Sequence, residues 1–148
     1  MPNSTVTSYL QEDHRRLDII AEEVGQKVRE GALPDAARRF EEFVSGLNRH
    51  IDVEENVLFP TFEELTGSPK GPTIVMRAEH RDIRRLMDAI TAALRGEAAS
   101  AAADGLVSLA RLLASHNHKE EYVLYPMTDN ALGSAEARAA LVRKMEDS

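Results

Sequence analysis

Hydrophobic residues recur at steps of three and four along almost the whole chain, which is the period of an amphipathic helix. No stretch alternates hydrophobic and polar residues for long enough to predict a strand. The first helical stretch ends at Gly31, and its inner stripe consists of Leu10, His14, Leu17, Ala21, Val24 and Val28. The pattern therefore predicts an all-α protein.

Three more long helices follow. The second is expected to begin near Pro34, the third to stop about Gly96 and the fourth to begin near Ser100. Ser4 to Ser8 supply candidate N-caps for the first helix, with Ser8 and Gln11 spaced as a capping box. Pro60 and Pro126 are expected to end or kink the second and fourth helices. Short connections between long helices predict an antiparallel, up-down-up-down four-helix bundle, with a short C-terminal helix from Ser134 to about Met145.

The chain also repeats itself. The segment HIDVEENVLFP, residues 50–60, returns as HNHKEEYVLYP, residues 116–126, at an offset of 66 residues (from 50 to 116). The same offset carries His14 onto His80 and Gly67 onto Gly133. The sequence therefore predicts an internal two-fold repeat in which each unit supplies one lone His and one His-x-x-x-Glu.

Composition excludes several classes of protein. The chain has 148 residues, no cysteine and a formal net charge of −7, so disulfides, thiolate metal sites and a nucleic-acid-binding surface are not expected. No leader and no membrane-spanning run is evident. We expect one cytoplasmic domain over residues 1–148, with a bundle core at about 5–130 and an appended helix at about 134–146.

Six polar residues occupy inner-stripe positions that should be hydrophobic. These residues are His14, His50, Glu54, His80, His116 and Glu120. Buried carboxylates need a counter-charge, and no Lys or Arg shares these stripes, so bound metal is the expected counter-charge. Imidazole and carboxylate donors without sulfur suit iron, manganese or zinc, and two equal sets of ligands favour two metals with each Glu bridging.

A lone His, then HxxxE followed by LFP or LYP, occurring twice, resembles the hemerythrin-like family, also called the HHE cation-binding domain. The resemblance extends from His14 to Pro126. It implies a non-haem di-iron centre, expected to carry an oxo or hydroxo bridge, that reacts with dioxygen or related small molecules. By the same resemblance the four histidines would be terminal ligands, and Glu54 and Glu120 bridging carboxylates.

One departure from the oxygen-carrying members guides the expected function. They have a further His one turn after the third-helix His, and here that position is Arg84. If no other side chain fills this position, each metal keeps an open coordination position, and hydrogen peroxide or nitric oxide could then engage both metals. We therefore predict redox chemistry on a small oxidant (hydrogen peroxide, dioxygen or nitric oxide), catalase-like or nitric-oxide-handling, rather than reversible oxygen carriage. The alternatives are an oxygen- or iron-binding, storage or sensing module without turnover, and a structural bundle holding zinc; manganese also stays open.

Other polar residues have simpler interpretations. His118 is expected on the surface, Glu55 and Glu121 beside the ligands or on the surface, and Asp13 and Glu79 in solvent. Asp18 is a weak candidate for an extra ligand. Tyr122 and Tyr125 are ordinary amphipathic aromatics by default, with a phenol at an empty iron position as the alternative. The expected partner is a small-molecule ligand, with no nucleic acid and no membrane; the sequence names no protein partner or electron donor.

Overall fold

The computed structural model describes residues 4–69 and 71–148, and these are helical with no strand. The predicted all-α class is confirmed. The elements in chain order are α1 (Val6–Arg29), α2 (Leu33–Val53), the π-helical segment η1 (Glu54–Leu58), α3 (Phe59–Thr66), α4 (Pro72–Arg95), α5 (Ala99–Lys119), the π-helical segment η2 (Glu120–Leu124), α6 (Tyr125–Leu132) and α7 (Ala135–Glu146).

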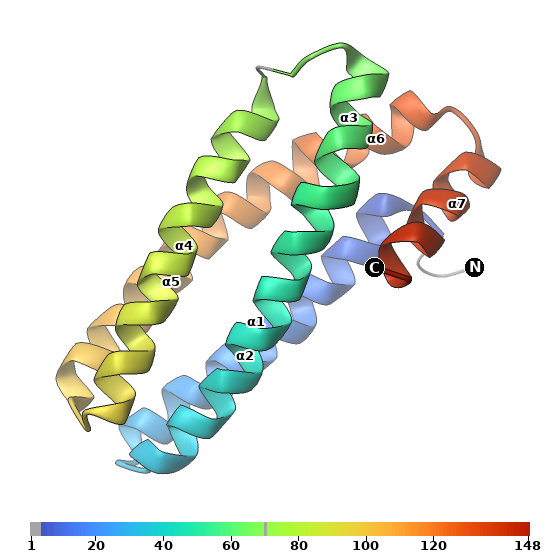
Figure 1. Ribbon diagram of the computed structural model, residues 1–148. Coiled ribbons are helices and arrows are strands. Elements are labelled where there is room, and N and C mark those ends of the chain that lie inside the picture. Colours follow the sequence, from blue (N-terminus) through green and yellow to red (C-terminus); the bar gives the residue numbers. More distant parts are fainter. Residues whose placement is uncertain (1–3, 70) are drawn as a thin grey trace.

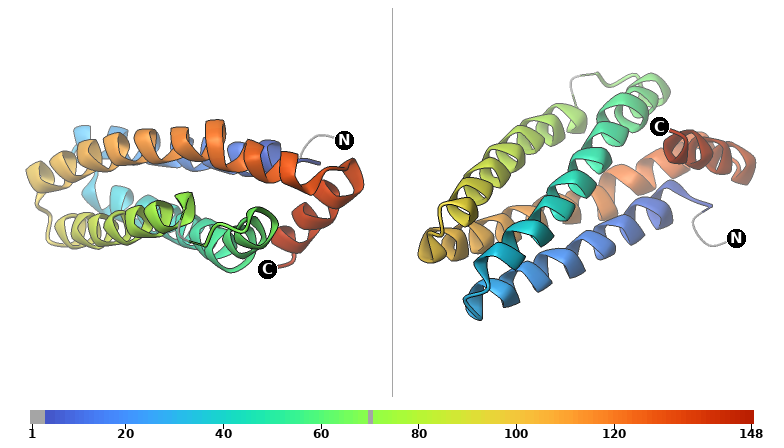
Figure 2. Two further views of the ribbon diagram at one scale, coloured as in Figure 1. Left: turned by 90° about the horizontal axis from the view of Figure 1, so that it is seen from above. Right: turned by 60° about the horizontal axis from the view of Figure 1, so that its bottom comes forward.

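Four long helical runs lie side by side as a helical bundle (Figure 1). Helix α1 packs against α2 and α5, and α4 packs against the same two helices, so each helix has two neighbours. The shorter α7 crosses the end of the bundle near the N-terminus (Figure 2). No described helix is long and apolar enough to cross a membrane.

The N-terminus of α1 is capped within the predicted stretch Ser4 to Ser8, but the capping box is not the one expected. Thr5 is the N-cap, and Ser8, expected to begin the capping box, is its partner inside the helix. The Asp129 carboxylate of α6 accepts hydrogen bonds from the backbone N–H groups of Val6 at 2.8 Å and Thr7 at 3.0 Å. These bonds pair free donors of α1 and fix its start against the fourth helical run.

Pro60 and Pro126 were expected to end or kink their helices, and the first alternative, an end, is wrong. Helix α3 continues from Phe59 to Thr66, and α6 from Tyr125 to Leu132. Each proline follows a π-helical segment, where the N–H of Phe59 donates to the carbonyl of Glu54, five residues back. A proline ring in a regular α-helix clashes with the carbonyl four residues back, and the wider π turn places that carbonyl differently. The extra residue in the turn therefore lets the helix run on through the proline.

Two hydrophobic clusters fill the bundle. One contains Leu17, Phe40 and Ile83 and lies toward the α1–α2 and α4–α5 connections; the other contains Leu10 and Phe59. Helix α7, expected to be appended, contributes its buried side chains to the second cluster: Leu141, Val142 and Met145. Because His14 lies between Leu10 and Leu17 in α1, the polar site falls between the two clusters.

Candidate metal centre

The six polar side chains singled out by the sequence come together inside the bundle, and each is at most 3 % exposed. Every long helical run contributes to this cluster. Lone histidines come from the two runs without π turns, α1 and α4, and a His and a Glu come from each run that contains a π turn. Glu54 is the first residue of η1, and Glu120 is the first residue of η2. Each carboxylate predicted to bind metal therefore lies at the start of a widened helical turn. Such π segments recur at functional sites.

The cluster consists of two groups of four ligand-type residues that share both glutamates. One group is His14, His50, Glu54 and Glu120, and the other is Glu54, His80, His116 and Glu120. Within each group, the donor atoms lie within 4.8 Å of one another. The Nε2 atom of His80 lies 3.1 Å from Glu54 Oε1, and that of His116 lies 3.2 Å from Glu120 Oε1. These separations match those between ligands of one ion.

An outer ring of carboxylates orients the four imidazoles. Each His presents Nε2 to the centre and forms a hydrogen bond through Nδ1 with an acidic side chain: His14 with Glu121 at 2.7 Å, and at 2.8 Å His50 with Asp13, His80 with Glu55 and His116 with Glu79. Partners of this kind fix the tautomer and raise the basicity of metal-binding histidines. Asp13 and Glu79, expected in solvent, therefore act at the centre. The sequence did contain a sign of these roles, because in both copies an acidic residue directly precedes the lone His and another directly follows the Glu of the cluster.

Charge in the cluster favours protonated imidazoles when no metal is bound. Burial lowers the pKa of His50, but Glu54 and Asp13 overcome this effect and raise it to about 10. Burial likewise lowers the pKa of His80, and Glu120 and Glu54 raise it to about 10. Burial raises the pKa of Glu120, but His116, His14 and His80 have a larger effect in the opposite direction, and the pKa lies well below its usual value. The glutamates thus attract positive charge, whether protons or metal ions.

Three buried polar atoms in the cluster have no hydrogen-bond partner among the described residues: Glu54 Oε1, His80 Nε2 and Glu120 Oε2. An unpaired polar atom in a protein interior costs roughly 1–3 kcal/mol. All three belong to residues predicted as ligands, and all three face the shared interior of the two groups. The residues present therefore fit metal cations, which would satisfy these atoms.

Tyr125 adds a phenol to one side of the cluster. Its side chain is fully buried, and its hydroxyl lies 2.5 Å from Glu54 Oε2, 3.0 Å from Glu120 Oε1 and 3.2 Å from His14 Nε2. Burial, and then the two glutamates, raise the pKa of Tyr125 well above its usual value. The sequence left the role of this residue open, and the structure places it at the centre.

The remaining candidates lie outside the cluster. Arg84, which stands where oxygen carriers have an additional His, hydrogen-bonds to Asn48 and Asp52 of α2. His118 is exposed and lies against Tyr122, with ring centroids 4.5 Å apart, and Tyr122 is exposed as well. Asp18 belongs to neither group of four. Among residues 4–69 and 71–148, no further His or Asp joins either group of four at the position that Arg84 occupies.

The buried His and Glu cluster defines a helical cation-binding domain. A family model, described as the hemerythrin HHE cation-binding domain, matches residues 5–128. The chain belongs to this family. No curated protein and no solved structure matches the chain.

Proposed function

We propose that this chain is a non-haem di-iron protein that reacts with a small oxidant: hydrogen peroxide, dioxygen or nitric oxide. Glu54 and Glu120 are the proposed bridges, and the proposed terminal ligands are His14, His50, His80 and His116. The observation that carries the proposal is that both groups of four share the same two glutamates. Two metal ions roughly 3.5–4 Å apart need common ligands of this kind.

The two halves of the chain are inferred to be copies of one unit in an up-down-up-down bundle. The 66-residue offset from Glu54 to Glu120 also relates the two π segments, which begin at these residues. Each copy would then supply one lone His and one His-x-x-x-Glu. A pair of equivalent metal positions related by the repeat follows from this interpretation.

When bound, two iron ions would supply electrons and coordination positions for the oxidant. The residues of the chain hold and shield that chemistry. The carboxylates of Asp13, Glu55, Glu79 and Glu121 keep each imidazole Nε2 directed at the centre. The hydrophobic clusters on both sides exclude water, which strengthens electrostatic interactions within the site.

Tyr125 makes the two proposed metal positions unequal. Its hydroxyl lies beside His14 and His50 of one group, where it holds a proton against Glu54. The residue 66 positions earlier is Phe59, which stacks on His80 of the other group, with ring centroids 5.6 Å apart, and has no polar atom in its side chain. Of the two open positions, the one on the His80 and His116 side is therefore proposed to receive the oxidant first.

The test is reconstitution with iron. Purified protein is supplied with ferrous iron without air, the metal per chain is measured by elemental analysis, and visible absorption is recorded after admission of air. We expect about two irons per chain and a charge-transfer spectrum. Consumption of peroxide and of nitric oxide is then compared with that by the same concentration of free iron.

Each outcome distinguishes the candidate functions. Turnover above that of free iron supports the proposed chemistry. Stoichiometric iron without turnover supports the alternative of a storage or sensing module. A colourless protein that holds zinc or no metal overturns the proposal. His118→Ala, outside the cluster, is the control that should keep its iron.

A further inference from the structure

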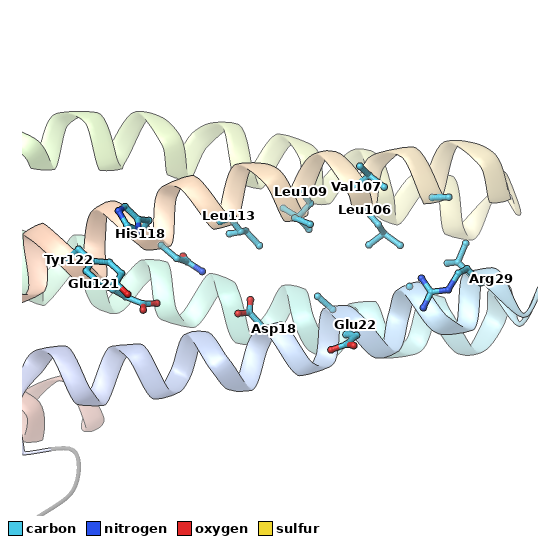
Figure 3. Close-up of a pocket in the computed structure, with 17 residues that line it drawn as sticks. Asp18, Glu22, Arg29, Leu106, Val107, Leu109, Leu113, His118, Glu121 and Tyr122 are labelled. Atoms are coloured by element: carbon cyan, nitrogen blue, oxygen red, sulfur yellow. The ribbon is translucent and has the colours of Figure 1, made fainter.

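A cavity of about 770 Å³ lies between α1 and α5 (Figure 3). It reaches Glu121, which hydrogen-bonds to His14 of the proposed metal centre. Its apolar wall consists of Leu106, Leu109 and Leu113 on α5. Small side chains on α5, among them Ala110 and Ala114, leave it open to solvent. Ligand sites in proteins typically measure about 300–1,000 Å³, so this groove has the size of a small-molecule site.

The opposite face of the bundle shows why this groove is open. Between α2 and α4, Arg84 donates hydrogen bonds to Asn48 at 3.1 Å and to Asp52 at 2.8 Å. At the C-terminal end of α4, its last residue Arg95 donates to Glu41 of α2 at 3.4 Å. Two arginines therefore cross from α4 to α2 and cover the seam between these helices.

On the α1–α5 face, the 66-residue offset replaces Arg84 and both of its acceptors, whereas Arg95 corresponds to Arg29, which donates to Gln26 of its own helix at 2.8 Å. Arg84 corresponds to Asp18, and its acceptors Asn48 and Asp52 correspond to Ala114 and His118. Among the residues that the structure describes, no side chain from Arg15 to Arg29 hydrogen-bonds to α5 or forms an ion pair with it. The seam that arginine covers on one face is thus uncovered on the other, where a carboxylate stands in place of the cation.

Two carboxylates on the α1 side of the groove are not paired with a cation, and Arg29, which also lines the groove, donates to the neutral Gln26 instead. Asp18 and Glu22 lie one turn apart on the same face of α1, and like charges at this spacing repel each other. Within residues 4–69 and 71–148, neither carboxylate has a hydrogen-bond or ion-pair partner. Desolvation raises the pKa of Asp18, and the nearby Glu121 raises it further against the effect of His14. A cation in the groove would relieve this repulsion.

We propose that the α1–α5 groove binds a small organic cation with an apolar stem, of the class of the primary alkylamines. The ammonium group lies at Asp18 and Glu22, and the alkyl chain extends along Leu109 and Leu106 (Figure 3). Such a ligand supplies both the charge and the hydrocarbon stem that Arg84 supplies to the other face. The groove also reaches Glu121, which holds His14, so the bound cation would lie beside the proposed centre.

The first test compares three probes of equal chain length: octylamine, octan-1-ol and octanoate. Binding to the purified, metal-containing protein is measured by isothermal titration calorimetry at neutral pH. We expect octylamine to bind about tenfold more tightly than either of the other probes, because only its ammonium group can form ion pairs with both Asp18 and Glu22. Equal or tighter binding of octanoate would place the head group at Arg29 instead and overturn the proposal, as would absence of octylamine binding.

Matched variants locate the site. Ala110→Phe, on the exposed edge of the groove, should weaken octylamine binding at least tenfold, whereas Ala101→Phe, exposed on α5 away from the groove, should not change it. Glu22→Gln should weaken binding about threefold, and Asp88→Asn, at the corresponding position on α4, should have no effect. Unchanged binding in both groove variants would contradict the proposal.

Two additional measurements keep these results unambiguous. Circular dichroism melting shows whether Ala110→Phe is folded, and Glu22→Gln, a surface change, serves as the second variant if it is not. Light scattering at the calorimetry concentration reports the oligomeric state. A dimer that Ala110→Phe dissociates would mean that a second copy of the chain covers the groove, and the proposal would be wrong.

Discussion

Tyr125 and Phe59 lie 66 residues apart, at the same position after the two glutamates of the centre, yet only Tyr125 brings a polar atom to it. The Tyr125 hydroxyl is 2.5 Å from Glu54 Oε2, whereas the Phe59 ring stacks on His80 with an interplanar angle of 12°. A centre whose ligands are otherwise repeated is therefore chemically different on its two sides.

Replacing Tyr125 tests this difference directly. Tyr125→Phe removes a buried hydroxyl that hydrogen-bonds with both glutamates, so we expect the metal-free protein to lose about 1–3 kcal/mol of unfolding free energy. The measurement is urea denaturation of chelator-treated protein. In the iron-loaded form, a change in the visible spectrum would show that the phenol also contacts the metal.

The reciprocal variant Phe59→Tyr provides the comparison, since it places a second hydroxyl at the corresponding position. If the phenol matters only as a packing ring, Tyr125→Phe will match the wild type in stability and spectrum, and the proposed inequality of the two positions must be abandoned.

Glu54 belongs to both groups of four, so its replacement should affect both metals. Glu54→Gln keeps the shape of the side chain and removes its charge. We expect the metal bound per chain, measured by elemental analysis after iron loading, to fall from about two toward zero. His80→Ala, which alters only the second group, should retain more metal than Glu54→Gln. Full metal content in Glu54→Gln would exclude a bridging role.

The outer carboxylates should tune metal affinity without being ligands. Glu55 hydrogen-bonds to Nδ1 of His80 at 2.8 Å, and Glu55→Gln weakens the control of that imidazole. Changes of this kind typically cost 10–100-fold in metal affinity, and competition with a coloured chelator measures it. Glu64→Gln, an exposed glutamate in the same helical run, is the control. Equal affinities for the two variants would show that Glu55 has no effect on the metal.

The helices and the six-residue cluster were predictable because both depend on period. A step of three or four residues determines which side chains face inward, and polar residues such as His14 and Glu54 stand out against a hydrophobic stripe. The continuation of the helices through Pro60 and Pro126 was not predictable in this way. The rule that proline breaks a helix assumes a regular α-helix. Here a π segment precedes each proline, and its wider turn removes the geometry on which the rule depends.

The roles of Asp13 and Glu79 were missed for a different reason. Each is adjacent to a lone His, and rotation of about 100° per residue directs it away from its own stripe. Whether it meets solvent or a neighbouring helix depends on how closely the helices pack, which the sequence of one helix does not contain. Here both reach the next helix, where Asp13 meets His50 and Glu79 meets His116.

The pKa shifts predict how stability changes with pH in the metal-free protein. His50 and His80 have pKa values of about 10 in the folded chain, against the ordinary value of 6.5 for histidine. A raised folded-state pKa stabilises the fold fully below the unfolded value, and this contribution is lost as the pH rises through the folded value. We therefore expect the melting temperature of chelator-treated protein to fall progressively between about pH 6.5 and pH 10. Metal ions replace these protons, so the iron-loaded protein should lack this decline. A metal-free protein that keeps or gains stability over the same range would show that the glutamates are not balanced by imidazolium, and the charge argument for the metal site would lose its support.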